Sequence, residues 1–351
     1  MGRTARVMSE TFPLRQRIGK MTLNSPLIPA NQVATTLAHL IKAGVRVFTL
    51  DFALGRFRTA LREAGLSEQK IASLMRDNLD HHDGNNPGLT ATEVAIRSIS
   101  QFKGKYAVVS DQTIDADNVC STFVAMNPKM ARAHKAILTE VARYGDYFDE
   151  VSESAMQIAL TIDAMRFGKN KFNKPFFLLT PEQQGELFNE ILAKMPKMLT
   201  DIGLFREMYE GELAKLNAAR ERGRAEALIR PVNEFTAVVD EPAFPRAIAY
   251  QLSDKAIVIG RKDLGVGKFN YNPVGLNPRV ANYDLTGLWE RLRNLENKER
   301  VKKGLSVLEV NQSWGGREAA GGSPKDEGIG SILTLDQVAN EIRQYLLEQK
   351  A

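Results

Sequence analysis

The sequence predicts an α/β protein: a mostly parallel sheet flanked by helices, then a helical connector, then a smaller α+β domain. Within residues 1–150, short β-rich runs alternate with helical stretches, which is typical of a parallel sheet covered by helices. The 351 residues suffice for two domains of about 150 residues each.

Three strands are expected in the first part of the chain, at residues 45–51, 78–80 and 106–110. Each run leads into an acidic residue, namely Asp51, Asp80 or Asp111. The carboxyl ends of parallel strands lie at one edge of a sheet, and ligands of open α/β sheets bind there. We therefore expect a ligand site at this edge.

The expected helices carry recognisable start signals. A Thr followed three residues later by Glu or Gln forms a capping box, in which each side chain satisfies the other residue's backbone N–H. Such boxes begin at Thr90, Thr180 and Thr334. Asn127 before Pro128 predicts a further helix that runs towards Tyr144.

The sequence changes in character at Thr180. A long helical tract reaches about Ala227, and strand-like runs follow at 235–239 and 256–259. We therefore expect three parts: residues 1–179 as the first domain, residues 180–229 as a helical connector, and residues 230–351 as the second domain.

Charge and cysteine content narrow the class of protein. Lys plus Arg number 47 and Asp plus Glu 42, which gives a net charge of +5 and favours anionic partners. The single cysteine, Cys120, excludes an internal disulfide and suits packing, so a reducing, cytoplasmic compartment is expected. The sequence contains no apolar run long enough to predict a membrane span, and no membrane partner is expected. The Arg-bearing, acid-poor N-terminus is also compatible with an organellar transit peptide.

Carboxylates and imidazoles gather around the expected strand ends, as an Asp-His-His triplet, an Asp-x-Asp pair and two single acids. These residues are Asp51, Asp80, His81, His82, Asp115, Asp117 and Asp146. Taken singly, Asp51 or Asp146 would be interpreted as a helix cap or loop residue. Carboxylate and imidazole ligands without thiolates suit Mn²⁺, Mg²⁺ or Fe²⁺ better than structural zinc. The set as a whole therefore predicts a metal centre.

These motifs resemble those of the DHH phosphoesterase superfamily. Asp80-His81-His82 is similar to the naming motif, and Asp115-Ala116-Asp117 is similar to the Asp-x-Asp motif. Asp51 and Asp146 are similar to two further single acids of the family. Residues 314–323, Trp-Gly-Gly-Arg-Glu-Ala-Ala-Gly-Gly-Ser, resemble the glycine-rich signature of the DHHA1-like substrate-binding domain that follows the catalytic domain in many members.

The resemblance implies a metal-dependent phosphohydrolase or phosphodiesterase that uses two Mn²⁺ (or Mg²⁺) ions to activate a water. The implied metal ligands are Asp51, His81, Asp115, Asp117 and Asp146. His82 would contact the phosphoryl group, and Asp80 would orient the imidazoles. The implied substrate-binding residues are Gly315, Gly316, Arg317, Gly321 and Gly322. The substrate is expected to be a nucleotide, a short oligonucleotide or a small phosphorylated compound, held in a cleft between the domains.

Two departures from the family pattern keep alternatives open. The Asp-x-Asp motif follows the Asp-His-His triplet here, so the motif order is permuted. Gln112 stands where the family usually has His, and a neutral amide is a weaker metal ligand unless Asp111 serves instead. A non-catalytic nucleotide- or phosphate-binding regulatory protein is therefore the alternative function, and a metalloenzyme with other chemistry is a third.

Several further residues have two interpretations. Trp289 and Trp314 either pack a core or stack on a nucleobase. The basic residues of the tract 166–174 form either a solvated face or an anion-binding wall. The same holds for Arg261, Lys262, Lys268 and Arg279. A homo-oligomer is compatible with the sequence.

Overall fold

The computed structural model of the chain describes residues 16–18, 21–23, 32–51, 54–80, 86, 88–104, 106–110, 114–241, 244–280, 283–309, 312–316, 320–324 and 330–350. The chain forms two compact units, Met1–Glu212 and Leu213–Ala351, each with its own core. Both units combine a sheet with helices, which confirms the predicted α/β fold class.

The N-terminal unit is built on a parallel three-stranded sheet with the order β4-β3-β5. Its strands are β3 (Arg46–Leu50), β4 (Asn78–Leu79) and β5 (Tyr106–Ser110), close to the predicted positions. Leu50 is in register with Leu79 of β4 and with Ser110 of β5, so the three strands end side by side. A short antiparallel pair, β1 (Gln16–Ile18) and β2 (Met21–Leu23), precedes them.

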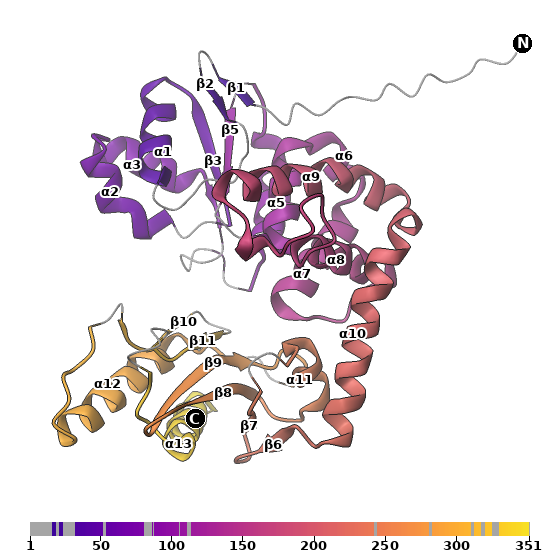
Figure 1. Cartoon of the computed structure of the whole chain (residues 1–351). Coiled ribbons are helices and arrows are strands. Elements are labelled where there is room, and N and C mark those ends of the chain that lie inside the picture. Colours follow the sequence, from indigo (N-terminus) through magenta and orange to yellow (C-terminus); the bar gives the residue numbers. More distant parts are fainter. Residues whose placement is uncertain are drawn as a thin grey trace, which may run out of the picture. The chain divides into compact units, whose positions relative to one another are not determined.

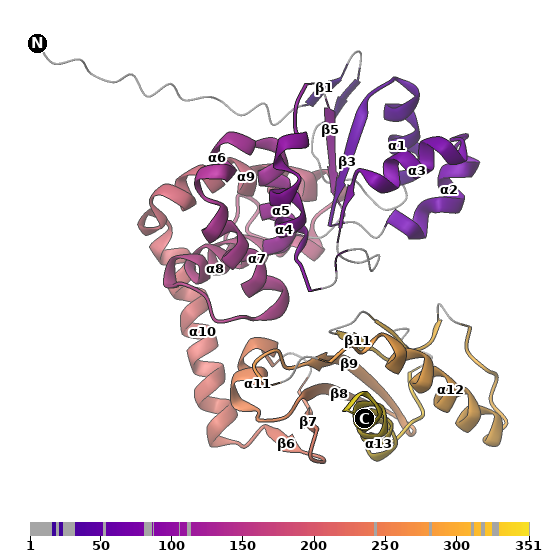
Figure 2. The ribbon, with the colours of Figure 1, turned by 180° about the vertical axis from the view of Figure 1, so that it is seen from behind.

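Helices cover both faces of this sheet (Figures 1 and 2). Val47 and Val109 share one core with α1, α2 and α3, whereas Phe48 and Val108 share another with the later helices. The helices are α1 (Val33–Lys42), α2 (Arg58–Glu63), α3 (Glu68–Arg76), α4 (Ala91–Arg97), α5 (Ala116–Met126), α6 (Pro128–Ala133), α7 (Lys135–Tyr147), α8 (Glu153–Arg166) and α9 (Pro181–Thr200). Short 3-10 turns are η2 (Leu54–Phe57), η3 (Ile99–Gln101), η4 (Phe176–Leu178) and η5 (Ile202–Phe205).

The predicted helix starts are confirmed at three capping boxes. Thr90 and Thr180 each exchange side-chain and backbone hydrogen bonds with the residue three places on, and Thr334 does so with Gln337. The helix predicted after Asn127 is two helices, because the chain turns at His134 between α6 and α7.

The long tract after Thr180 is also two helices, α9 and α10 (Arg206–Ala225). The chain leaves helical geometry at Asp201, where φ is −154° and ψ is 80°. Leu187, Phe188 and Ile191 of α9 are buried in the core of the N-terminal unit. Helix α9 is therefore a structural part of this unit, and the division between the units falls within α10.

The C-terminal unit holds a mixed six-stranded sheet with the order β10-β11-β9-β8-β7-β6. Its strands are β6 (Ile229–Pro231), β7 (Thr236–Val239), β8 (Ile257–Gly265), β9 (Lys268–Leu276), β10 (Gly315–Gly316) and β11 (Ala320–Gly322). Only β7 and β8 pair in parallel among the described strands of this sheet. Helices α11 (Arg246–Leu252), α12 (Thr286–Lys302) and α13 (Leu335–Lys350) complete the unit.

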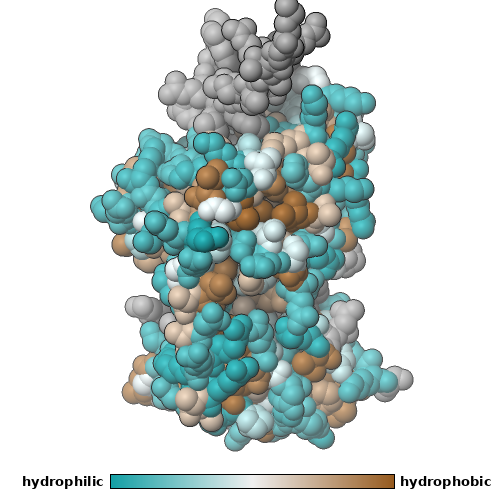
Figure 3. Space-filling model, turned by 90° about the vertical axis from the view of Figure 1, so that its right-hand side faces the viewer, coloured by the Kyte–Doolittle hydropathy of each residue, from teal (hydrophilic) through white to brown (hydrophobic). Residues whose placement is uncertain are grey.

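The surface seen in Figure 3 is mainly hydrophilic, with scattered hydrophobic patches. No helix in the described part of the chain is both long enough and apolar enough to cross a membrane.

Candidate functional site

Asp51 and Asp80 lie next to each other where β3 and β4 end. Each follows a residue of the paired register Leu50–Leu79, and the Asp51 N–H donates to the Leu79 carbonyl at 3.4 Å. Both residues are buried, with exposed fractions of 6% and 3%. Asp51 has a φ of 47°, a left-handed conformation that non-glycine residues adopt rarely and that often persists at functional sites. The strand ends thus hold two acids away from solvent.

Asp115 begins α5, the helix that follows the third strand. Its Oδ1 accepts a hydrogen bond from the Asn118 N–H at 2.9 Å, as an N-cap does. The Ser110 hydroxyl donates to the Asn118 side chain and, at 3.4 Å, to the Leu50 carbonyl. These bonds fasten the start of α5 to the ends of β3 and β5, on the edge where Asp51 lies.

Asp146 lies near the end of α7, which packs directly against the start of α5. A Cβ atom on Gly145 would lie 2.7 Å from the Ala116 Cβ, closer than real contacts allow, so the two helices touch here. Asp146 comes directly after Gly145, and its Oδ2 is buried. Helix packing therefore brings the end of α7, which carries Asp146, against the start of α5, which Asp115 caps.

Asp117 has a different environment from the other predicted ligands. Its side chain is fully buried, and its two carboxylate oxygens accept the N–H groups of Ala91 and Thr92 at 2.7 and 2.8 Å. The Thr92 hydroxyl also donates to the Asp117 carbonyl at 3.1 Å. A carboxylate at a helix N-terminus satisfies unpaired N–H groups and offsets the helix dipole. Asp117 thus fixes α4 onto α5.

Asp163, on α8, is a residue of this region that the sequence reasoning missed. Burial raises the pKa of its carboxyl to about 6, Arg166 opposes the rise, and the negative charges of Asp115 and Glu212 add to it. The negative charges of Asp163 and Asp115 therefore repel each other. In the sequence, Asp163 stands out only as a single acid between the apolar residues Ile162 and Ala164, both of which are buried.

Helix α7 holds Gly88 and Leu89, the residues just before α4. Arg143 donates to the Gly88 carbonyl at 3.2 Å and forms ion pairs with Glu93 and Asp149. The Tyr147 hydroxyl donates to the carbonyl of Leu89 at 3.1 Å. The helix that carries Asp146 therefore also holds the entry to α4.

His81, His82 and Arg317, together with Asp111 and Gln112, lie outside the described residues. Among the residues that are described, no three His, Cys, Asp or Glu side chains are grouped closely enough to hold a metal ion. The described acids nevertheless supply carboxylate oxygens, which divalent cations such as Mn²⁺ and Mg²⁺ prefer as ligands. Oδ1 of Asp51 and Oδ2 of Asp80 are buried, so carboxylate oxygens face the interior at these strand ends.

The glycine-rich segment forms a hairpin of β10 and β11 on the sheet. A Cβ atom on Gly316 would lie 2.4 Å from the Gly321 Cα and 2.7 Å from Trp289 Cε2, and one on Gly322 would lie 2.9 Å from the Tyr271 carbonyl oxygen. These glycines are therefore required for the backbone to pass over the core. Gly315 has nothing within 4 Å of a Cβ and is exposed.

Trp314 is fully buried and stacks on Tyr271, with ring centroids 5.7 Å apart, so its core interpretation is confirmed. Its indole N–H donates to Glu296, which is itself fully buried. Trp289 packs in the same core. Cys120 is buried beside α7, and burial raises the pKa of its thiol, which fits packing rather than nucleophilic chemistry.

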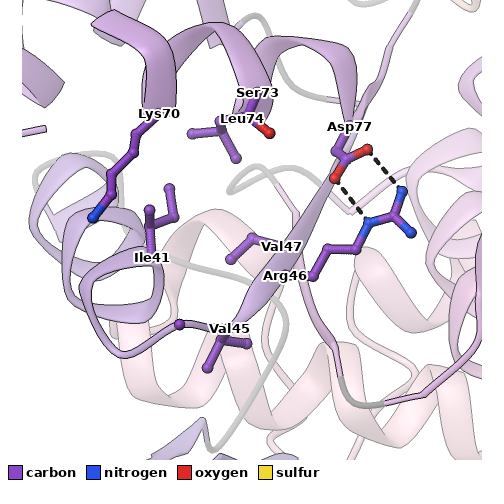
Figure 4. A pocket seen from close by; sticks show the side chains of 9 residues that line it. Ile41, Val45, Arg46, Val47, Lys70, Ser73, Leu74 and Asp77 are labelled. Atoms are coloured by element: carbon purple, nitrogen blue, oxygen red, sulfur yellow. Dashed lines mark hydrogen bonds and ion pairs between the residues drawn. The ribbon is translucent and has the colours of Figure 1, made fainter. Parts of the chain in front are cut away.

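A cavity of about 350 Å³ lies at the other end of β3 from Asp51 (Figure 4). Apolar side chains of Ile41, Val47 and Leu74 line it, and the Arg46–Asp77 ion pair closes one side. Because it opens at the amino end of the strand, this cavity is separate from the acidic strand ends.

The fold and site define a two-unit α/β protein with buried acids at the carboxyl ends of parallel strands. Residues 79–346 match the family described as "Family of unknown function (DUF6687)", and the chain belongs to that family. No curated protein matches the sequence. Among solved structures, the chain is similar to the pGpG-specific phosphodiesterase PggH from Vibrio cholerae, with 13% identity, a TM-score of 0.37, and coverage of 87% of this chain and 98% of that one. Similarity at this level assigns no function to the chain.

Proposed function

We propose that the protein is a divalent-metal-dependent phosphohydrolase of the DHH type, acting on a nucleotide, a short oligonucleotide or a small phosphorylated compound. The observation that carries the proposal is the adjacent pair of buried acids, Asp51 and Asp80, at the ends of two paired parallel strands. Asp115, which begins the helix after the third strand, supports a third acid ligand at the same edge of the sheet.

In this proposal, acids and an imidazole from separate elements hold the metal ions. The proposed ligands are Asp51, His81, Asp115, Asp146 and Asp163. Mn²⁺ or Mg²⁺ held by these residues would supply the positive charge that activates a water near neutral pH and stabilises the phosphoryl oxygens. His82 contacts the phosphoryl group, and Asp80 orients the imidazoles through an N–H hydrogen bond.

Asp117 takes a positioning role, because both of its oxygens already accept backbone N–H groups of α4. The hairpin of Gly315, Gly316, Gly321 and Gly322, with Arg317, remains the proposed site for the non-reacting part of the substrate. Exposed Gly315 is the hairpin position where a ligand could approach the backbone most closely.

The second candidate is a nucleotide- or phosphate-binding regulatory protein that does not turn over its ligand. Gln112 in place of a histidine ligand favours this candidate, because an amide oxygen binds Mn²⁺ more weakly than an imidazole.

The test is hydrolysis by the purified full chain with Mn²⁺, using a generic phosphodiester and a panel of nucleotides and short oligonucleotides. We expect metal-dependent hydrolysis that falls by about 10³-fold in Asp115→Asn and in His81→Ala. Asp201→Asn, at an exposed acid of the same unit, is the matched control and should leave the rate unchanged.

Calorimetric titration with Mn²⁺ separates the two candidates. Metal and nucleotide binding without turnover would overturn the enzyme and support the regulatory protein. Absence of both metal binding and hydrolysis would overturn the metal centre itself.

A further inference from the structure

We propose that the loop between α8 and α9, residues 166–180, is a docking surface for an anionic membrane. This proposal is independent of the catalytic one and departs from the sequence-based expectation of no membrane partner. The segment carries four basic residues and no acid: Arg166, Lys169, Lys171 and Lys174.

Large apolar side chains point into solvent from the same loop. Phe167, Phe177 and Leu178 have exposed fractions of 50%, 69% and 62%. Large exposed apolar groups that are clustered, rather than scattered singly, mark interaction sites. Phe177 and Leu178 are consecutive, on the 3-10 turn η4, so they form a continuous apolar tip.

The loop is held in this conformation by its own hydrogen bonds. The buried Asn170 amide donates to the carbonyls of Met165 at 2.6 Å and Lys174 at 2.9 Å, and its oxygen accepts the Phe172 N–H. The Gln184 side chain donates to the Phe176 carbonyl at 3.2 Å. Phe172 and Phe176 pack against the core, which leaves Phe167, Phe177 and Leu178 outside. The conformation of the loop, held by these hydrogen bonds, therefore keeps the three apolar side chains exposed.

The charges favour an anionic lipid surface over other occupants. Lys171 is paired with Glu186, whereas Lys169 and Lys174 are exposed and meet no carboxylate of the described residues at ion-pair distance. A second copy of this loop would repel it, because both copies carry the same positive charge. Single-stranded nucleic acid binds by stacking bases on aromatic rings, and Leu178, half of the apolar tip, has no ring to stack on. A shallow apolar tip flanked by lysines matches the way interfacial segments enter the headgroup region.

The test is co-sedimentation of the full chain with vesicles of phosphatidylcholine alone or with about 30% phosphatidylserine. We expect binding to the anionic vesicles that weakens with added salt and is absent with phosphatidylcholine alone. Two double variants, Phe177→Ser with Leu178→Ser and Lys169→Glu with Lys174→Glu, should each lower the affinity at least about tenfold.

Matched controls lie in the C-terminal unit. Val266→Ser, at a side chain that is 98% exposed, and Lys298→Glu, on the exposed side of α12, should not change vesicle binding. Circular dichroism and thermal unfolding of each variant confirm that it is folded before its affinity is compared. Equal binding by the loop variants, or none by the wild type, would overturn the proposal.

Two further results would also overturn it. If the loop variants abolish binding of a labelled single-stranded oligonucleotide while vesicles do not bind, the surface is a nucleic-acid site. If they change the sedimentation coefficient of a wild-type oligomer, the surface joins copies of the chain.

Discussion

Glu296 in the C-terminal unit and Asp163 in the N-terminal unit are both acids on helices, yet their surroundings differ: Glu296 is fully buried, whereas Asp163 is partly exposed. Glu296 accepts hydrogen bonds from Ser331 Oγ at 2.6 Å, from the Ile332 N–H at 3.1 Å and from the Trp314 indole, with Arg300 at 3.6 Å. Asp163 instead lies in the electrostatic field of Asp115 and has a raised pKa. Burial alone therefore does not distinguish a structural acid from a chemical one. The surroundings do, because hydrogen-bond donors stabilise the charge of Glu296, whereas burial first and then the charges of Asp115 and Glu212 oppose that of Asp163.

The variant Glu296→Ala tests the structural role of Glu296 in this comparison. This change leaves the donors of Ser331, Ile332 and Trp314 buried without their acceptor, which we expect to cost about 3–5 kcal/mol in the free energy of unfolding. Urea denaturation measures the loss. Glu290→Ala, at an exposed acid on the same helix, should change stability by less than about 0.5 kcal/mol, and a similar loss in both would contradict the assignment.

The opposite effect is expected for Asp163→Asn in the metal-free protein. An acid whose folded pKa is about 6 rather than 3.8 opposes folding at pH 7, so its neutralisation should stabilise the protein by about 1–3 kcal/mol. The sign follows from linkage. The folded state binds the proton more tightly, so wild-type stability from this group is fully present below about pH 4 and is lost as pH rises through 6.

Urea unfolding in the presence of a chelator, from pH 4 to pH 8, gives both quantities. The difference between wild type and Asp163→Asn should vanish at the acidic end of this range. A destabilised variant at pH 7 would show that Asp163 is held by donors, as Glu296 is, and would remove the contrast between the units.

The hairpin offers a matched pair of glycines. Gly316→Ala drives a Cβ against Gly321 and Trp289, so we expect a loss of about 1–3 kcal/mol in unfolding free energy. Gly315→Ala meets nothing within 4 Å and should change stability by less than about 0.5 kcal/mol. If Gly315→Ala nevertheless weakens substrate binding, the hairpin serves the ligand as well as the fold.

A smaller effect than that of Gly316→Ala is expected for Asp117→Asn. One oxygen and the negative charge at the start of α4 are lost, which should cost about 1–2 kcal/mol in the metal-free protein. A gain in stability, as expected for Asp163→Asn, would instead mean that Asp117 belongs with the crowded acids of the metal centre. The sign of the change thus separates a positioning residue from a ligand.

The local parts of the fold were predictable from the sequence. The three strands of the N-terminal unit are short runs that lead into an acid, and the capping boxes at Thr90, Thr180 and Thr334 use interactions between residues three apart. The break at Asp201 was not predictable in this way. The residues that follow it, Ile202 to Phe205, are mostly apolar and form η5, which contacts α8 and α9.

The positions of the site residues at the strand ends were predictable from the sequence, whereas the contacts of those on helices were not. Asp51 and Asp80 follow β-rich runs, so their neighbouring positions follow from parallel pairing alone. The hydrogen bonds between Asp117 and α4 join residues that are separated by 25 and 26 positions in the chain, so no local sequence pattern predicts them. Asp163 was missed because its interaction with Asp115 joins two different helices, and the sequence around Asp163 shows only a single acid among apolar residues. The metal ligation of these residues stays a prediction.

The contact between Gly145 and Ala116 has a consequence for how this family can vary. Because the two positions share one small space, a methyl group at position 145 requires the removal of the one at position 116. A family member with Ala at the position of Gly145 should therefore carry Gly at the position of Ala116. Substitutions at these two sites are expected to be correlated across relatives, although the sites belong to different helices.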